Sequence, residues 1–219
     1  MLPVRSLADG MCLTLLSPVW PDLVSLRRVW DAELAKAGME TAAAAPDTDP
    51  PGLESFGALT IDDVDQAAAS RFKPDASAAN ASSICVLAEF DGRRAVLTGD
   101  AHADVVSNSL ARMQENGARI KIDAWKFSHH GSQGTHSIDV MQRITCGRFL
   151  ISTDGSRHKH PHIESIARTL VQASVGSELF CNYRSQETER WDVADLKRRY
   201  RYEIRLPPES EQGTMGIAL

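Results

Sequence analysis

The sequence predicts an α/β fold, in which a β-sheet is layered against helices. One observation is a pair of β-rich runs, 83–90 and 94–98, joined by Asp91-Gly92, a dipeptide that strongly favours a two-residue hairpin turn. Another is the alternation of apolar, strand-like runs with helical patterns in the chain that follows. An antiparallel hairpin followed by alternating strands and helices is typical of an α/β layered fold.

Apolar periodicity and breaker residues place the individual elements along the chain. The first strand ends at Ser17-Pro18. A helix then opens at Pro21-Asp22, has apolar residues at intervals of three and four, and closes at Gly38. The expected strands are 12–16, 83–90, 94–98, 120–128, 148–152, 178–182 and 202–206, and the expected helices after the first are 61–72, 103–115, 137–144, 163–173 and 193–199.

Residues 40–79 differ in composition from their surroundings. Four consecutive alanines are followed by Pro46, Pro50 and Pro51, and only the stretch 61–72 has a helical pattern. Long segments of this kind in compact domains are usually lids over a site or disordered. We therefore interpret 40–79 as a flexible insertion or lid, with 1–39 and 80–219 as the parts that build the domain.

Composition excludes several classes of protein. The formal net charge of −5 gives no general electrostatic reason to bind nucleic acid or an anionic membrane. The four cysteines stand far apart and form no Cys-x-x-Cys pair, so a disulfide framework is not expected. No apolar stretch approaches the roughly 18 residues that a membrane span needs. The expectation is a cytoplasmic protein that does not enter the membrane.

Candidate metal ligands stand where predicted strands end. Asp100 follows the second strand of the hairpin, the pair His129-His130 follows the next strand, and His160 comes after the strand beyond that. Neighbouring strands would bring a carboxylate and imidazoles to one edge of the sheet, and this donor set suits Zn²⁺, with Mn²⁺ or Fe²⁺ as alternatives. Taken singly, Asp100 is also a common helix cap and the histidine pair a common loop feature. Their combination favours a metal site.

Four short stretches also carry a family resemblance, and they are Asn80-Ala81-Ser82-Ser83-Ile84, Leu97-Thr98-Gly99-Asp100-Ala101, Lys126-Phe127-Ser128-His129-His130-Gly131-Ser132 and His160-Pro161. Their order and spacing resemble those of one metallo-β-lactamase subfamily over roughly residues 80–182. That subfamily includes hydrolases similar to the hydrolase domain of bacterial competence DNA-uptake channel proteins. A Gly-Asp pair alone is weak evidence, whereas the ordered set is specific.

The resemblance implies an αββα sandwich whose metal ions sit at the edge between two sheets. Asp100 resembles the carboxylate that bridges two metals, and one of His129 and His130 resembles the last histidine ligand. Neighbouring residues of a strand point to opposite faces, so only one of the two histidines is expected at the metal. Which of them binds is left open.

Further roles are implied for residues around this centre. His160 resembles a pocket residue that could donate a proton to a leaving group, while Ser132 and Asn80 either contact substrate or brace the site. The implied catalytic residues are Asp100, His130 and His160, the implied metal ligands are Asp100, His129 and His130, and the implied cofactor is one or two zinc ions.

The family's first metal-binding run is absent from this sequence. The subfamily places a His-x-His-x-Asp-His run after an early strand, whereas no histidine precedes His102 here. Catalytic zinc normally has three protein ligands, and Asp100 with one histidine provides two, with His160 at most a third. The chain therefore resembles the C-terminal half of the family domain.

Three hypotheses for function follow. The chain is one piece of a split or truncated hydrolase whose first half a partner protein supplies, a degenerate non-catalytic domain that serves as an interaction module, or a weak single-metal hydrolase. The first is favoured, and it implies that a metal-bound hydroxide hydrolyses an ester or phosphodiester. Nucleic acid is a possible substrate that the net charge does not support. A missing half-sandwich would also leave an apolar sheet surface that promotes self-association or partner binding.

Overall fold

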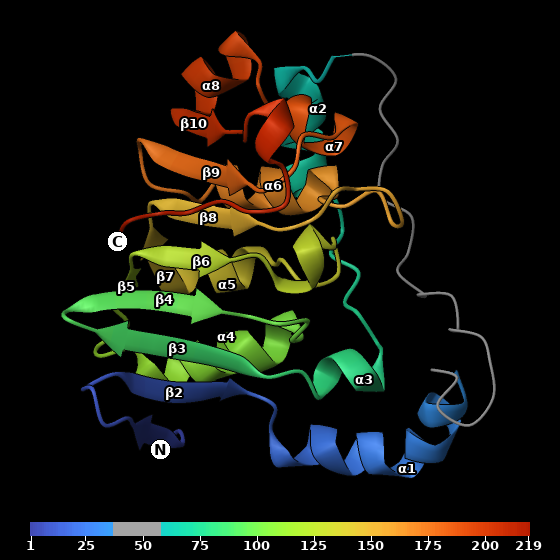
Figure 1. The fold of residues 1–219 in the computed structure, drawn as a ribbon, viewed down its shortest axis with the longest axis vertical. Coiled ribbons are helices and arrows are strands. Elements are labelled where there is room, and N and C mark those ends of the chain that lie inside the picture. The colour runs from blue at the N-terminus through green and yellow to red at the C-terminus, as the bar shows by residue number, and fades with distance from the viewer. Residues whose placement is uncertain (37–57) are drawn as a thin grey trace.

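The structure, a computed structural model, describes residues 1–36 and 58–219 and is built around one eight-stranded sheet (Figure 1). Its strands lie in the order β1-β2-β3-β4-β6-β8-β9-β10, from the bottom to the top of the figure. Their bounds are β1 Val4–Ser6, β2 Cys12–Ser17, β3 Cys85–Phe90, β4 Arg93–Leu97, β6 Ala124–Lys126, β8 Arg148–Ile151, β9 Ser177–Cys181 and β10 Tyr202–Arg205. Two further strands, β5 Ile120–Ile122 and β7 Ile144–Cys146, form a separate parallel pair.

The sheet has an antiparallel half and a parallel half. Strands β1 to β4 pair antiparallel, and β4, β6, β8, β9 and β10 then follow one another in parallel. The β3–β4 hairpin turns at Asp91 and Gly92, which have φ of 47° and 72°, the positive values that this two-residue turn requires. The α/β class and the hairpin on which it was predicted are confirmed.

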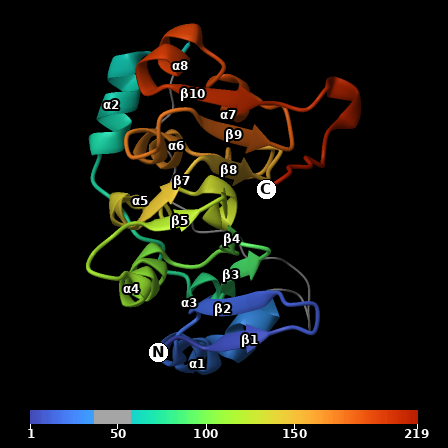
Figure 2. The ribbon, with the colours of Figure 1, turned by 90° about the vertical axis from the view of Figure 1, so that its left-hand side faces the viewer.

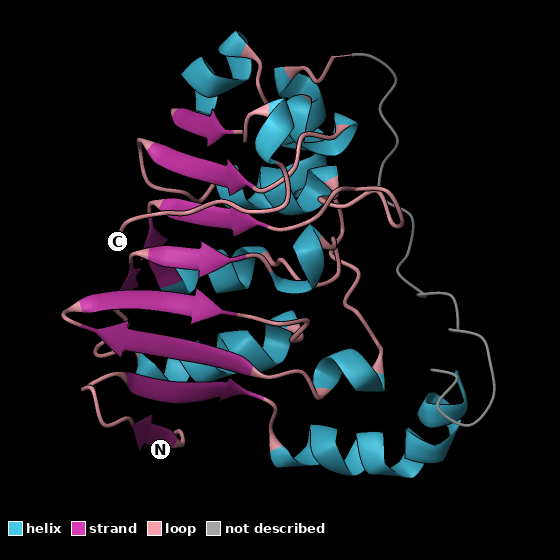
Figure 3. Ribbon diagram, in the orientation of Figure 1, coloured by secondary structure: helices cyan, strands magenta, loops and turns pink. Residues whose placement is uncertain are grey.

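Helices cover one face of the sheet, as the colouring by secondary structure shows (Figure 3). Helices α4, α5 and α6 lie behind it in Figure 1 and to one side of it in Figure 2. Buried side chains at matched positions of four neighbouring strands, Val96, Trp125, Phe149 and Leu179, form the core on this face. The helix bounds are α1 Trp20–Lys36, α2 Ile61–Ala69, α3 Ala78–Ala81, α4 Ala103–Met113, α5 Ile138–Arg143, α6 Ile163–Leu170, α7 Gln186–Glu189 and α8 Ala194–Tyr200.

The opposite face of the sheet is mostly apolar, with Lys126 in register between Leu97 and Leu150, and it is largely uncovered by the described residues. Leu97 in β4 is 49% exposed, and its cross-strand partner Val86 in β3 is only partly buried. In Figure 1 no described helix lies in front of β3 and β4. We call this surface the open sheet face, and its partly exposed apolar residues are Leu13, Leu15, Val86, Ala88, Ala95, Leu97, Leu150 and Phe180.

The strand predicted at 120–128 is divided at Asp123. The carboxylate of Asp123 accepts from the amide of Arg94 at 2.9 Å, and its own amide donates to the Arg94 carbonyl at 2.8 Å. Strand β5 pairs with β7, whereas β6 joins the main sheet between β4 and β8. The prediction of one continuous strand was wrong, because a side chain that bonds to nearby backbone competes with the regular ladder.

Residues 58–79, the described part of the expected insertion, are packed onto the domain. Helix α2 confirms the helix predicted at 61–72; it begins with a capping box in which Thr60 and Asp63 exchange hydrogen bonds. Its buried face, Val64, Ala67 and Ala68, belongs to the domain core, and the helix packs against α6. Residues 40–57, and the Gly38 stop predicted for the first helix, lie outside the described residues.

Periodicity did not predict the short elements β1, α3 and α7, because three or four residues are too few to display a pattern.

All four cysteines are free thiols, as their spacing led us to expect. Within residues 1–36 and 58–219, we find no helix that is both long and apolar enough to cross a bilayer.

Candidate functional site

The predicted site residues meet at the carboxyl ends of β4, β6 and β8. Asp100 follows β4, His129 and His130 follow β6, and His160 follows β8, so neighbouring parallel strands deliver all four to one edge of the sheet. A cavity of about 480 Å³ opens at this edge. Its lining includes these four residues together with Asn80, Asp154, Arg157, His158 and Tyr183.

Backbone geometry at the end of β4 sets the position of Asp100. Gly99 has φ of +52°, a left-handed conformation that turns the chain out of the strand. A Cβ added to Gly99 would lie 2.5 Å from Oγ of Ser83, and that hydroxyl accepts from the Asp100 amide at 2.9 Å. The Gly99 carbonyl accepts from the amide of His129 at 2.9 Å. Through this hydrogen bond, the turn at Gly99 connects the loop of Asp100 directly to the loop of the histidine pair.

The histidine pair has a conformation that the strand pattern did not predict. Strand β6 ends at Lys126, and residues 128–131 form a 3₁₀ turn in which His129 and His130 have left-handed φ of 44° and 55°. Both rings line the cavity, with their centroids 6.4 Å apart. The extended backbone on which we based opposite orientations is therefore absent at these two residues, and strict alternation holds only for extended backbone.

Neighbouring groups orient the rings of this cluster. Nδ1 of His130 lies 2.5 Å from the carbonyl oxygen of Ser152, which only accepts, so in the neutral ring Nδ1 carries the proton and Nε2 carries the lone pair. His160 is buried, with its ring centroid 5.4 Å from that of His129 and 6.5 Å from that of His130. One wall of the cavity is therefore a cluster of imidazoles.

The segment after the histidine pair packs closely against the start of α6 and forms a hydrogen bond with it. A Cβ added to Gly131 would lie 2.7 Å from Cβ of Pro161, and the Gly131 carbonyl accepts from Oγ of Ser165 at 2.6 Å. Ser132 is fully buried, and its Oγ accepts from the amide of Gly134 at 3.2 Å. Of the two residues expected to contact substrate or to brace the site, Ser132 lies in a bracing position and Asn80 lines the cavity.

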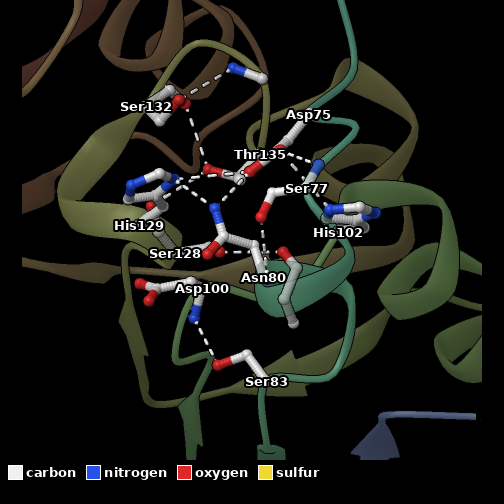
Figure 4. A network of polar contacts seen from close by, with 12 residues as sticks. Asp75, Ser77, Asn80, Ser83, Asp100, His102, Ser128, His129, Ser132 and Thr135 are labelled. Atoms are coloured by element: carbon white, nitrogen blue, oxygen red, sulfur yellow. Dashed lines mark hydrogen bonds and ion pairs between the residues drawn. The ribbon is translucent and has the colours of Figure 1, made fainter. Parts of the chain in front are cut away.

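Asp75, in the segment before α3, is a site residue that sequence reasoning missed (Figure 4). Its Oδ2 lies 3.5 Å from Nδ1 of His129, and its Oδ1 lies 3.6 Å from Nε2 of His102. Asn80 Nδ2 donates to Oδ2 at 2.7 Å, and the Ser77 amide donates to Oδ1 at 2.7 Å. In sequence the residue resembles an ordinary turn or capping residue, and nothing there marks it as the partner of a histidine.

Opposing effects set the charge of Asp75. Burial raises the pKa of its carboxyl, but the contacts with His102, His129, Asn80 and the Ser77 amide outweigh burial and hold the pKa well below its usual value. The contact with Asp75 raises the pKa of His102, against the effect of burial. Asp75 is therefore a carboxylate at neutral pH, and its charge faces two imidazoles.

The cavity lining also contains side chains of the types that bind oxyanions in proteins. Arg157 and His158 line it from the loop after β8, and Tyr183 lines it from the loop after β9. Arg157 carries a permanent positive charge, and Asp154 on the same loop adds one negative charge. A guanidinium forms bidentate hydrogen bonds with carboxylate or phosphate oxygens, so this part of the cavity suits a substrate with an anionic group.

The donor types at this edge fit a zinc ion, but their number does not. Asp100, His129 and His130 offer carboxylate and imidazole donors to one cavity. Among the residues that the structure describes, no three His, Cys, Asp or Glu side chains converge closely enough to hold a metal ion.

Comparison with known proteins identifies no relative. No protein-family model matches the chain, and no curated protein or solved structure matches it. The α/β class rests on the structure, and the finer resemblance to the metallo-β-lactamase family rests on the four sequence stretches alone.

Proposed function

We propose that this chain carries part of the active site of a metal-dependent hydrolase of the metallo-β-lactamase superfamily, acting on an ester or phosphodiester. The observation that carries the proposal is that Asp100, His129, His130 and His160 line one cavity at the ends of three parallel strands. A cavity with convergent titratable groups is the default position for an active site.

In this proposal the side chains of the cavity have separate roles in metal binding and proton donation. Zinc, when bound, supplies an acidified water and polarises the bond to be cleaved. Asp100 and the rings of His129 and His130 are the groups that would hold it. His160, beside both rings, would give a proton to the leaving oxygen.

Two further residues of the lining, Arg157 and Tyr183, suit an anionic substrate. Arg157 would bind a non-bridging phosphate oxygen or a carboxylate, and the Tyr183 hydroxyl would donate to the same group. This favours a substrate that is anionic close to the bond that breaks. Nucleic acid meets that requirement, although the net charge of −5 gives no added attraction for it.

Zinc binding by the purified 219-residue chain is the direct test. Asp100→Ala removes a cavity carboxylate, and the control Asp104→Ala removes an exposed carboxylate from α4, outside the cavity lining. Calorimetry and elemental analysis are expected to show zinc in the unmodified chain and in Asp104→Ala, and its loss in Asp100→Ala. An unmodified chain that takes up no zinc at saturating concentration would overturn the proposal.

Because the described residues provide too few metal ligands for a catalytic zinc site, the proposal includes a partner protein. The His-x-His-x-Asp-His run is absent from these 219 residues, and the described donors do not form a three-ligand group. We propose that the chain binds zinc by itself through this partial ligand set and that a partner protein supplies the further ligands that catalysis requires. The partner would pack on the open sheet face, where a second copy of this chain is the alternative occupant.

The open sheet face also favours a second candidate function, a non-catalytic interaction module. In that case the chain associates through the open sheet face but takes up no zinc. Light scattering after size-exclusion chromatography, with zinc analysis of the same fractions, separates the candidates. A monomer with a cooperative unfolding transition would count against any role for the open sheet face.

A further inference from the structure

We infer that Asp75 is a positioning residue, whose carboxylate orients the His129 ring so that Nδ1 carries the proton and Nε2 is presented to the cavity. Its consequence for metal binding rests on the proposed function, whereas the ring orientation does not. No sequence stretch that carries the family resemblance contains Asp75.

The contacts around His129 indicate which of its ring nitrogens carries the proton. Asp75 Oδ2 lies 3.5 Å from His129 Nδ1, and the two side chains are only 9% and 8% exposed, so water competes little for either. In Figure 4 the other ring nitrogen lies on the side away from Asp75. An ionised carboxylate only accepts, and its charge therefore favours the proton on the ring nitrogen that faces it.

Asn80 connects the two side chains. Its Nδ2 donates to Asp75 Oδ2 at 2.7 Å and lies 3.4 Å from His129 Nδ1. The short bond to Asp75 fixes the carboxylate beside the ring. Asn80 by itself would favour the opposite tautomer, since an amide nitrogen donates to an imidazole lone pair, whereas the carboxylate favours the proton on Nδ1.

Backbone packing holds Asp75 against the histidine loop. The Asp75 amide donates to the Gly134 carbonyl at 3.2 Å. A Cβ added to Gly134 would lie 2.9 Å from the Asp75 nitrogen and 3.2 Å from the carbonyl oxygen of Lys73. The close approach of 73–75 to this loop therefore requires glycine at 134, so Gly134→Ala displaces Asp75 without changing its chemistry.

The neighbouring histidine has the same arrangement. His130 Nδ1 lies 2.5 Å from the Ser152 carbonyl oxygen, and its ring also lines the cavity. Histidines that bind metals usually donate their other N–H to a carboxylate or a carbonyl, which fixes the tautomer and orients the ring. Asp75 and the Ser152 carbonyl are two such acceptors for two adjacent rings.

The test measures the His129 tautomer directly. Imidazole ¹⁵N chemical shifts are recorded on the full chain at pH 8 without metal, above the ordinary imidazole pKa of about 6.5, and His129→Gln identifies the resonances. We compare the unmodified chain with Asp75→Asn, Gly134→Ala and the exposed-carboxylate control Asp104→Asn. Zinc affinity and the urea unfolding midpoint are measured on the same samples.

The inference expects protonated Nδ1 in the unmodified chain and in Asp104→Asn, and a shift toward protonated Nε2 in Asp75→Asn and Gly134→Ala. Zinc affinity is expected to fall about 10- to 100-fold in both site variants. A tautomer that is unchanged in folded Asp75→Asn or Gly134→Ala would overturn the inference, as would protonated Nε2 in the unmodified chain. Failure of the unmodified chain to bind zinc would overturn the proposed function, while the tautomer would still decide the role of Asp75.

Discussion

Nη2 of Arg168 in α6 donates to Oγ of Ser70 at the end of α2 at 3.0 Å, which joins residues 98 positions apart in sequence. The same guanidinium donates from Nη1 to the Gln133 carbonyl at 3.1 Å and lies 5.3 Å from the ring centroid of Phe72. Arg168 is 1% exposed. It therefore connects the segment that leads to Asp75 with the loop that follows the histidine pair.

We expect Arg168→Ala to lower the free energy of unfolding by about 2–4 kcal/mol, because it leaves buried carbonyls without a donor and opens a cavity. The loss of unfolding free energy in Arg168→Lys should lie between zero and the loss in Arg168→Ala, since a single ammonium cannot reach both loops. Urea unfolding followed by circular dichroism measures both. The matched control is Arg198→Ala, whose side chain is 75% exposed and which should change stability by no more than about 0.5 kcal/mol. Equal losses in the two alanine variants would contradict the role of Arg168.

Gly99→Ala should displace Asp100 as well as destabilise the fold. The new Cβ would meet Oγ of Ser83 at 2.5 Å in a backbone with φ of +52°, which we expect to cost about 1–3 kcal/mol. Gly92→Ala is the control, because Gly92 also has positive φ but nothing lies within 4 Å of its Cβ position. Both variants should lose stability, and only Gly99→Ala should weaken zinc binding. Similar zinc affinity in the two would show that the Ser83 contact does not set the Asp100 position.

Buried His136 should make the fold sensitive to acid. The ring is 1% exposed and packs on Phe127 with centroids 4.0 Å apart, and neither ring nitrogen has a hydrogen-bond partner among the described residues. Burial, together with the charges of Lys126 and Arg168, lowers the pKa of His136 well below 6.5. Below about pH 6.5 the unfolded chain binds a proton that the folded chain does not, so stability falls as pH decreases.

The measurement is urea unfolding of the unmodified chain and of His136→Leu from pH 7 to pH 5. The unmodified chain should lose up to about 2 kcal/mol more than His136→Leu across this window. His102 has a raised pKa, so its stabilising contribution is fully present below the unfolded pKa and adds little slope here. Parallel pH profiles for the two proteins would refute the prediction.

Leu97→Glu should reduce association through the open sheet face without unfolding the domain. Leu97 is 49% exposed, so the change should alter monomer stability by only about 0.5 kcal/mol. It nevertheless adds a carboxylate, beside Lys126, to a mostly apolar surface that would be buried on association. Light scattering should show a lower mass than for the unmodified chain. Val175→Glu, at a residue that is 72% exposed outside the sheet, is the control and should leave the mass unchanged. A mass that does not respond to Leu97→Glu would exclude this face as the contact.

Much of the fold could be predicted because local signals are strong in this chain. Asp91-Gly92 readily adopts the positive φ that the hairpin turn requires. Apolar runs identified the main strands, and their ends predicted that Asp100 and His160 would lie at one edge, because the carboxyl ends of parallel strands meet there. Periodicity and turn chemistry are properties of neighbouring residues, and the sequence by itself determines them.

Only the tertiary structure decided the finer geometry of the site. The left-handed turn at His129 depends on a bond to the Gly99 carbonyl, and the break at Asp123 depends on bonds to Arg94. The contact of Asp75 with His129 requires the segment before α3 to pack on the histidine loop. Each of these features is a contact between residues distant in the chain, so no period or local motif in the sequence encodes it, and packing sets it.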